Sequence, residues 1–388
     1  MSSLPKQTPL PWNRPEYRAF FYQFLVVLTL VAIGWYLLSN TLENLQRQNI
    51  ATGFAFLGAE SAFEIGESLI PYAPTDSYAR ALLVGSLNTV KTAVIGIVLT
   101  VLLGTVMGIA RLSKNGLIAG LAAVYVELFR NIPVLLQLFF WYALFHQLPG
   151  PRQALEPFSG VFVCSRGFLF PAPRINGPEG LVLLLVPLAL LLGWWLCRKN
   201  RIYCESHGKN RIHPAFLSLV PVLLVLGANV VAGATWQMDV PALQGFNIRG
   251  GGIVTPEFGA LLLGLVIYTG TFVAEIVRSG ILAVDKGQVE AAKSLGLSNS
   301  RILYLIVLPQ ALRVIIPPLT SQMLNLTKNS TLAVAVGYPD LVSVANTTLN
   351  QTGQAIEAIS IIMVVYLVFS LVTSLFMNWF NKRAILPS

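Results

Sequence analysis

The chain has 388 residues, of which 55% are hydrophobic and 11% are charged, and its mean hydropathy is +0.67. Soluble domains carry about a quarter charged residues, so this composition excludes a soluble globular protein and indicates an integral membrane protein. The formal net charge of +9 does not indicate a nucleic-acid partner, because the basic residues cluster at the ends of apolar segments and are explained by orientation in a lipid bilayer.

Eight segments are long and apolar enough to cross a bilayer, which takes about 20 mostly apolar residues. They lie at 19–38, 82–110, 117–145, 181–197, 215–234, 257–282, 310–326 and 356–380. The fourth segment is short and the seventh is polar. The sequence therefore predicts an all-α integral membrane protein with about eight helices.

The loops between these segments differ in charge, and short cytoplasmic loops carry an excess of Lys and Arg. The tail 1–18, the second, fourth and sixth loops and the C-terminus are basic, which predicts that both termini are cytoplasmic. Residues 19–80 are predicted to form a retained first helix and an acidic exported loop. The third loop, with Arg152, Arg166 and Arg174, obeys the rule poorly, although its prolines and its length fit an exported loop.

The third span contains a proline and a charged pair. Pro133 breaks the helical hydrogen-bond ladder and frees carbonyl groups that other groups must satisfy. Glu127 and Arg130 are three residues apart, so they can neutralise each other, and we interpret them as a structural pair. Gln137 follows as a candidate for the translocation path.

The sixth span carries Glu275, and an ionisable residue inside a span is costly and hence a functional candidate. Its carboxylate could attract an ammonium group along a water-filled path, with Thr269 on the same span as a second candidate. An equally weighted alternative is a structural salt bridge to Arg278 or Lys91.

Residues 290–309 form a polar island between two apolar segments. Good helix formers follow Glu290, and Gly296 suits the left-handed residue that ends a short helix. Ser298 and Ser300 can cap a second helix, and Pro309 closes that helix or opens the next span. Glu290 is predicted near the start of the first helix, where the macrodipole stabilises a carboxylate that stays available to a partner's arginine.

The seventh span ends in a row of polar side chains that a lipid-facing helix would not tolerate. Gln322 and Asn325 are predicted to face a dimer interface or the translocation path, where amides can meet a carboxylate. From Lys328 onward, a helix end that emerges into water is the better interpretation.

No motif for catalysis is present. An ATP-binding loop Gly-x4-Gly-Lys-Ser/Thr is missing, the three histidines suggest no zinc site, and Cys164, Cys197 and Cys204 lack metal-ligand spacing. We therefore expect no enzyme activity, no metal site and no cofactor bound by this chain. If ATP hydrolysis drives this protein, another protein must bind and hydrolyse the ATP.

The island matches a twenty-residue pattern: Glu-Ala-Ala, three residues, Gly, nine residues, Ile, one residue, Leu-Pro. The fixed positions are Glu290, Ala291, Ala292, Gly296, Ile306, Leu308 and Pro309. This resembles the cytoplasmic coupling loop of the permease subunits of ABC-type, ATP-driven uptake transporters. The segments 126–137 and 269–292 resemble polar amino acid permeases, although Asn131-Ile132 replaces the usual Gly-Thr.

The resemblance covers about three quarters of the chain and implies a type I ABC importer-like transmembrane domain at 81–388. It has an inserted helix pair at about 181–234 and a coupling loop at 287–309. The segments 12–15, 63–70 and 78–85 look like the larger permease subunits of general L-amino acid transporters.

This family implies a bacterial inner-membrane protein and several partners. These are two ATPase subunits that bind ATP and Mg²⁺, a second permease in a heterodimer or homodimer, and a periplasmic binding protein that delivers an L-amino acid. The alternative is an ion-coupled secondary transporter with Glu275 as its proton or sodium site. A membrane-bound enzyme is a third class that nothing in the sequence favours.

Overall fold

The computed structural model describes residues 15–47, 52–176 and 235–384, and between 177 and 234 only residues 192, 193, 195–197, 200, 221, 223 and 227. The predicted cytoplasmic tail 1–18 and the predicted helix pair at 181–234 therefore lie largely outside the described residues. The described chain divides into two compact units, one made of residues 1–101 and 275–388 and the other of residues 102–274.

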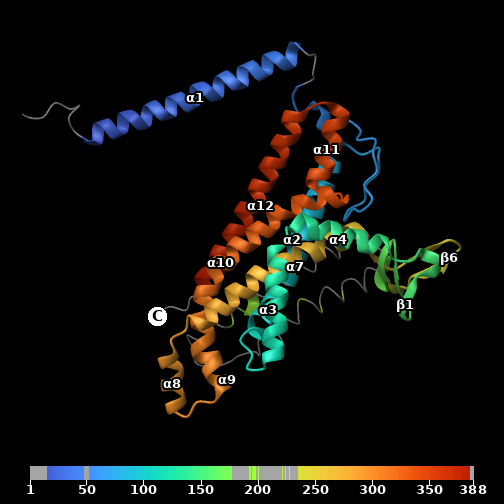
Figure 1. Cartoon of the computed structure of the whole chain (residues 1–388). Helices are drawn as coiled ribbons and strands as arrows, with labels where there is room; N and C mark the ends of the chain where they lie inside the picture. The colour runs from blue at the N-terminus through green and yellow to red at the C-terminus, as the bar shows by residue number, and fades with distance from the viewer. Residues whose placement is uncertain are drawn as a thin grey trace, which may run out of the picture. The chain divides into compact units, whose positions relative to one another are not determined.

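The helices confirm the predicted all-α membrane protein (Figure 1). Five helical segments within the described residues can span a membrane, or six if one bent pair counts as a single span. The helices are α1 (Pro15–Arg47), α2 (Tyr78–Ala110), α3 (Gly116–Asn131), α4 (Val134–His146), α7 (Pro256–Leu282), α8 (Lys286–Ser294), α9 (Asn299–Ile302), α10 (Leu308–Asn329), α11 (Leu341–Thr352) and α12 (Ala355–Ala384).

The predicted third span, 117–145, is not one straight helix. α3 and α4 meet at an angle of 105° around Ile132 and Pro133. Ile132 is extended, as expected for a residue that precedes proline. The side-chain amide of Gln137 donates to the carbonyl oxygens of Phe129 at 2.9 Å and Ile132 at 3.0 Å, so it satisfies carbonyls that the break frees.

The predicted seventh span, 310–326, is longer than expected. A helical run extends from Asn299 to Val336 through α9, a π-helical turn η4 (Leu303–Val307), α10 and a 3₁₀ segment η5 (Ser330–Val336). Pro309 explains the π turn, because proline cannot donate to the residue four positions earlier and its ring clashes with that carbonyl.

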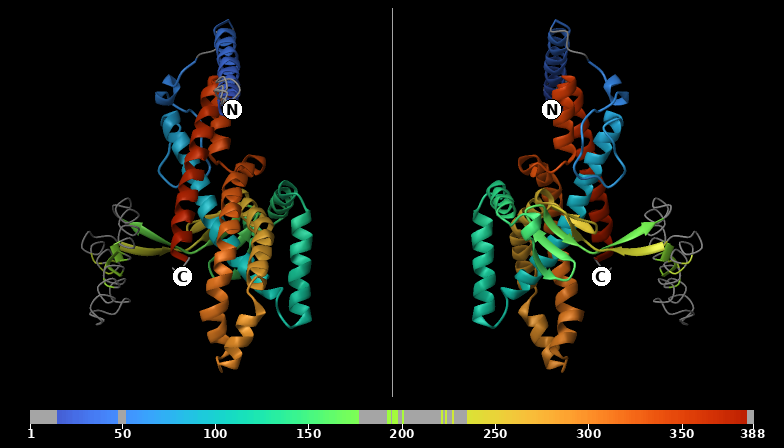
Figure 2. Two further views of the ribbon diagram at one scale, coloured as in Figure 1. Left: turned by 90° about the vertical axis from the view of Figure 1, so that its left-hand side faces the viewer. Right: turned by 90° about the vertical axis from the view of Figure 1, so that its right-hand side faces the viewer.

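Short strands, which the sequence analysis did not predict, fill the segments between α4 and α7. They are β1 (Leu155–Phe158), β2 (Val161–Cys164), β3 (Gly167–Phe170), β4 (Ala172–Asn176), β5 (Thr235–Asp239), β6 (Ala242–Gln244), β7 (Asn247–Arg249) and β8 (Gly252–Val254). An antiparallel sheet has the order β1-β2-β3-β8, and β4-β5 and β6-β7 form separate pairs. Figure 2 shows the short strands in green and yellow. Asn176 of β4 pairs with Thr235 of β5, so the residues on either side of 177–234 are neighbours.

Each unit is held by close helix contacts. In the first unit, Ala81 and Leu82 of α2 pack against Leu341, Val344 and Ala345 of α11. In the second unit, Leu138 of α4 packs so closely on Gly264 of α7 that a Cβ there would lie 2.4 Å from its Cδ2. A side chain at Gly264 would therefore require the buried Leu138 side chain to move.

Candidate coupling site

The candidate coupling site consists of α8, α9 and η4, which form a hairpin at one end of α10 (Figure 1). α8 starts at Asp285, whose side chain caps the helix by accepting from the Gly287 N–H at 2.8 Å. The predicted left-handed residue is confirmed, since Gly296 has φ +75° and the Gly296 N–H donates to Lys293 O at 2.9 Å. The N–H of Leu297 then reaches Ala292 O, which closes the helix end.

Two details of the predicted loop were wrong. Glu290 is the fifth residue of α8 and not near its start, so the helix dipole, whose effect falls off within the first turn, does not account for it. Ser298 occupies the N-cap position of α9 but its side chain makes no capping hydrogen bond. Pro309 lies in the first turn of α10, so it opens the span.

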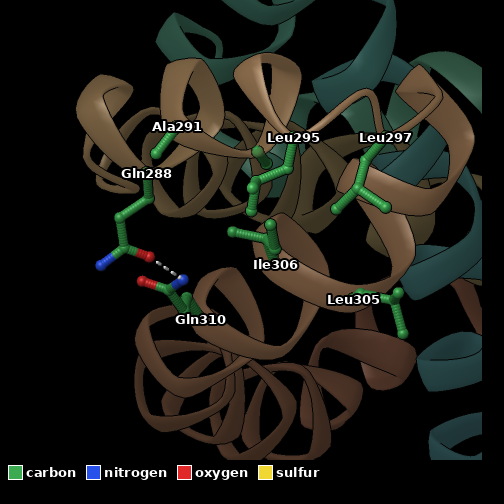
Figure 3. A pocket seen from close by; sticks show the side chains of 8 residues that line it. Gln288, Ala291, Leu295, Leu297, Leu305, Ile306 and Gln310 are labelled. Atoms are coloured by element: carbon green, nitrogen blue, oxygen red, sulfur yellow. Dashed lines mark hydrogen bonds between the residues drawn. The ribbon is translucent and has the colours of Figure 1, made fainter.

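A groove of about 330 Å³ runs between α8 and η4 (Figure 3). Its walls are mostly apolar, and two glutamines lie together at one end. Nε2 of Gln310 donates to Oε1 of Gln288 at 2.5 Å, which ties α8 to the start of α10. The lining residues are Gln288, Ala291, Ala292, Leu295, Leu297, Leu305, Ile306 and Gln310.

The groove explains several positions of the family pattern. Ala292 is 3% exposed, so a longer side chain there would push α8 away from the segment it packs on. Ala291 and Ile306 line the groove itself. Glu290 and Ala291 are exposed and are open to a second protein.

Apolar side chains beside the groove are strongly exposed. Leu295 is 82% exposed, Tyr304 71% and Leu305 60%. Contiguous exposed apolar side chains beside a preformed groove are typical of a protein interface. The arrangement therefore fits a docking surface, and it offers no group suited to bond-breaking chemistry.

The structure places Glu275 beside Arg278. Nη2 of Arg278 lies 2.5 Å from Oε1 of Glu275 on the same helix, and both side chains are about a third exposed. Lys91, the other predicted partner, forms an ion pair with Glu67. Arg278 is thus one of the two salt-bridge partners that the sequence analysis gave for a structural role of Glu275.

The other predicted path residues are dispersed. The amide nitrogen of Gln137 is committed to the bend between α3 and α4, and Thr269 is buried on α7. On α10, Gln322 is partly buried and Asn325 is exposed, while Met323 and Leu326 turn inward. Asn325 thus lies on a side of α10 that the described chain leaves open.

Glu127 and Arg130 are not brought together as an ion pair in the described part of the chain. Both are exposed, and the Arg130 guanidinium instead lies over the ring of Phe272, 5.4 Å from its centre. A cation gains from the electron-rich face of an aromatic ring, and this contact links α3 to α7.

Sequence reasoning missed a buried polar group that we call the Asp340 cluster: Asn88, Thr89, Asp340, Ser343 and Tyr366. Asp340 is 1% exposed, and its carboxylate caps α11 by accepting from the Ser343 N–H at 2.8 Å. Thr89 Oγ1 accepts from the Leu341 N–H, and Nδ2 of Asn88 donates to Pro339 O. The only advance signal was Asp340 itself, a good N-cap residue before an apolar run.

Burial raises the pKa of the Asp340 carboxyl to about 7. The backbone hydrogen bond from Ser343 and the hydroxyl of Tyr366, 3.4 Å away, oppose this rise because they stabilise the ionised form.

Comparison with known proteins gives these features a context. The chain is 48% identical to the general L-amino acid transport system permease protein AapQ of Rhizobium johnstonii, over 95% of this chain and 92% of AapQ. YhdX of Escherichia coli K12 is 48% identical over 96% of each chain. The glutamate/glutamine/aspartate/asparagine transport system permease protein BztB of Rhodobacter capsulatus is 37% identical, over 95% of this chain and 93% of BztB.

A family match covers residues 100–386, which include the bent helix pair, the strands and the whole coupling site. Because this match spans most of the chain and the relatives align along nearly all of it, the chain belongs to the family of binding-protein-dependent transport system inner membrane components.

Proposed function

We propose that this chain is the larger permease subunit of an ATP-driven importer of polar L-amino acids in a bacterial inner membrane. It pairs with a second permease, takes substrate from a periplasmic binding protein and is driven by two ATPase subunits, which bind ATP and Mg²⁺. The observation that carries the coupling role is the exposed apolar groove built on the Glu290–Pro309 pattern.

Relatives of full length support the substrate class. One is named as a general L-amino acid permease and another as a permease for glutamate, glutamine, aspartate and asparagine. The similarity extends over the first helix and the inserted segment, since AapQ aligns over 95% of this chain. A heterodimer with a shorter permease fits a chain that carries such additions.

The coupling mechanism follows from the continuity of the helices. Force applied to α8 reaches α10 through the Gln288–Gln310 hydrogen bond and through the unbroken run of α9, η4 and α10. The Ala283 N–H donates a helical hydrogen bond to Ser279 O, so the α7 helix continues to Ala283. Only Val284 and Asp285 then separate it from α8. A small displacement of α8 is therefore passed to α7 and α10 as a rigid-body movement.

The ion-coupled carrier has no observation in its favour. The family of this chain is binding-protein-dependent, and the Glu275 carboxylate is already engaged by Arg278. A proton or sodium site at Glu275 would have to break that pair first.

The test uses the whole transporter, purified with its ATPases and second permease and reconstituted in lipid. Glu290→Lys and Leu295→Asp should abolish ATP hydrolysis stimulated by the loaded binding protein, while the subunit stays in the membrane. Both positions are exposed, so neither change should lower the thermal unfolding midpoint.

Ser298→Ala is the matched control, because the exposed Ser298 side chain makes no cap hydrogen bond. Normal stimulation in the Glu290 and Leu295 variants would overturn the coupling role. Absence of any co-purifying ATPase would overturn the proposed assembly.

A further inference from the structure

The sheet β1-β2-β3-β8 has two apolar faces. Residues directly opposite each other in an antiparallel sheet share a face, and alternate residues along a strand point the same way. Leu155 pairs with Val163, Val163 with Phe168, and Phe168 with Val254. These four side chains form a row across all four strands, and Phe158, opposite Val161, extends it on the same side.

We call this row, Leu155, Phe158, Val163, Phe168 and Val254, the open face. The opposite face is filled by its own core, because Cys164 and Leu169 are at most 4% exposed and pack with Ile248. On the open face, by contrast, Leu155 is 57%, Phe158 74% and Phe168 39% exposed. An antiparallel sheet with one solvated face normally carries polar residues there.

The sheet is held close to the membrane boundary by its connections. β8 ends at Val254 and α7, which can span a bilayer, starts at Pro256. One intervening residue allows a reach of about 7 Å, since each residue spans at most about 3.3–3.6 Å. The sheet therefore joins α7 at the end from which this helix enters the bilayer.

The arginine side chains near the sheet also suit the membrane boundary. Arg152, Arg166 and Arg249 are exposed around the strands, beside the exposed Glu156 of β1. The Arg152 guanidinium lies over the ring of Phe246, 3.5 Å from its centre. Exposed arginines beside exposed aromatic rings are suited to the boundary where anionic phosphates meet acyl chains.

We propose that the open face rests on the membrane surface at the start of α7, with its aromatic side chains at the headgroup and acyl boundary and the neighbouring arginines at lipid phosphates. The occupant of the open face is therefore lipid. This inference goes beyond the coupling role and is independent of it.

The experiment places the photo-crosslinking residue p-benzoylphenylalanine at Phe158 or Phe168 in the whole transporter, an aromatic exchange at an exposed site. Nanodiscs contain either phosphatidylcholine alone or phosphatidylethanolamine with phosphatidylglycerol, and the binding protein is present. We expect mass-identified lipid adducts at both positions, with more adduct in the anionic discs.

Two controls make the result specific. The same residue at Phe162, which is opposite Leu169 on the core side, should give intramolecular adducts and little lipid. Arg166→Gln should lower the ratio of lipid adducts in anionic discs to those in phosphatidylcholine discs by about fivefold at Phe168, because one basic residue near an anionic surface contributes about 1 kcal/mol.

Adducts to the binding protein or to the second permease in place of lipid would overturn the proposal. Equal lipid labelling at Phe162 and Phe168 would overturn it too, since it would mean that neither face is selected. Neither result bears on ATPase coupling, which is measured separately at Glu290 and Leu295.

Discussion

The coupling loop and the Asp340 cluster lie at opposite ends of α10 in one compact unit, and they are built in opposite ways (Figure 1). The loop is local: its helices pack on neighbours within about two dozen residues, and Leu295 and Tyr304 stay exposed. The Asp340 cluster is non-local and buried, and Nδ2 of Asn88 reaches the carbonyl of Pro339, 251 residues away in the chain.

The difference shows which parts of a permease can be predicted from its sequence. The proposed docking surface is encoded in a short contiguous stretch, so it forms a motif. Buried hydrogen bonds that stabilise the fold can join side chains far apart in sequence, because they need only a donor and an acceptor that are close in space. Variants should accordingly separate the two regions, with lost coupling in one and lost stability in the other.

The largest stability effect is expected at Gly85. A Cβ there would lie 3.0 Å from Asp340 O and 3.0 Å from the Leu341 Cα, which are backbone atoms that cannot rotate away. Gly85→Leu should therefore force α2 and α11 apart and destabilise the subunit by about 3 kcal/mol or more. The measurement is the thermal unfolding midpoint in detergent.

Gly66→Leu is the control for Gly85→Leu, because nothing lies within 4 Å of a Cβ built at Gly66. A Gly85→Leu subunit that unfolds at the normal temperature would show that the contact between α2 and α11 is not needed. If Gly85→Leu lowered ATPase coupling per folded transporter without lowering stability, coupling would depend on the Asp340 cluster as well as on the loop.

Much of the coupling site was predictable because its rules are local. Gly296 at a helix end and Pro309 at the start of a span follow from backbone conformation alone. The position of Glu290 within α8 was missed, because the helix start at Asp285 lies outside the motif. The family pattern predicted an exposed loop available to a partner. It did not predict the groove, which depends on how α8 packs on η4.

The rest of the fold was harder to predict for physical reasons. Strands of three to five residues give too little alternation to distinguish them from loops, so the sheet was overlooked. Pro133 predicted a broken ladder, but the 105° angle depends on what α3 and α4 pack against. The Asp340 cluster joins segments far apart in sequence, and no local pattern records such pairs.

The second prediction concerns the pH dependence of stability through Asp340. Its pKa rises from an ordinary 3.8 to about 7 on folding, so between those values the folded protein binds more protons than the unfolded chain. The free energy of unfolding must then fall as the pH rises toward 7. We expect a loss of order 2 kcal/mol between pH 5 and pH 7 from this group.

Asp340→Asn keeps the shape but cannot ionise, so the unfolding midpoint should depend less on pH in this range. Burial raises the pKa of the neighbouring Tyr338 hydroxyl, so this side chain stays neutral throughout the range. An unchanged pH profile in Asp340→Asn would show that the carboxylate is not the group responsible.

The smallest effect gives the sharpest comparison, because each region has one glycine in the same conformation. Gly296 has φ +75° and Gly337 has φ +76°, and a Cβ would meet nothing within 4 Å at either. Gly296→Ala and Gly337→Ala should each cost about 1–2 kcal/mol, since a left-handed conformation strains any residue with a Cβ. Relief of that strain at Gly296 must move α8 relative to η4 and reshape the groove, whereas relief at Gly337 changes only the approach to α11. The ratio of binding-protein-stimulated to basal ATP hydrolysis should therefore fall in Gly296→Ala alone, and an equal fall in both variants would mean that coupling depends on the stability of the whole unit and not on the loop.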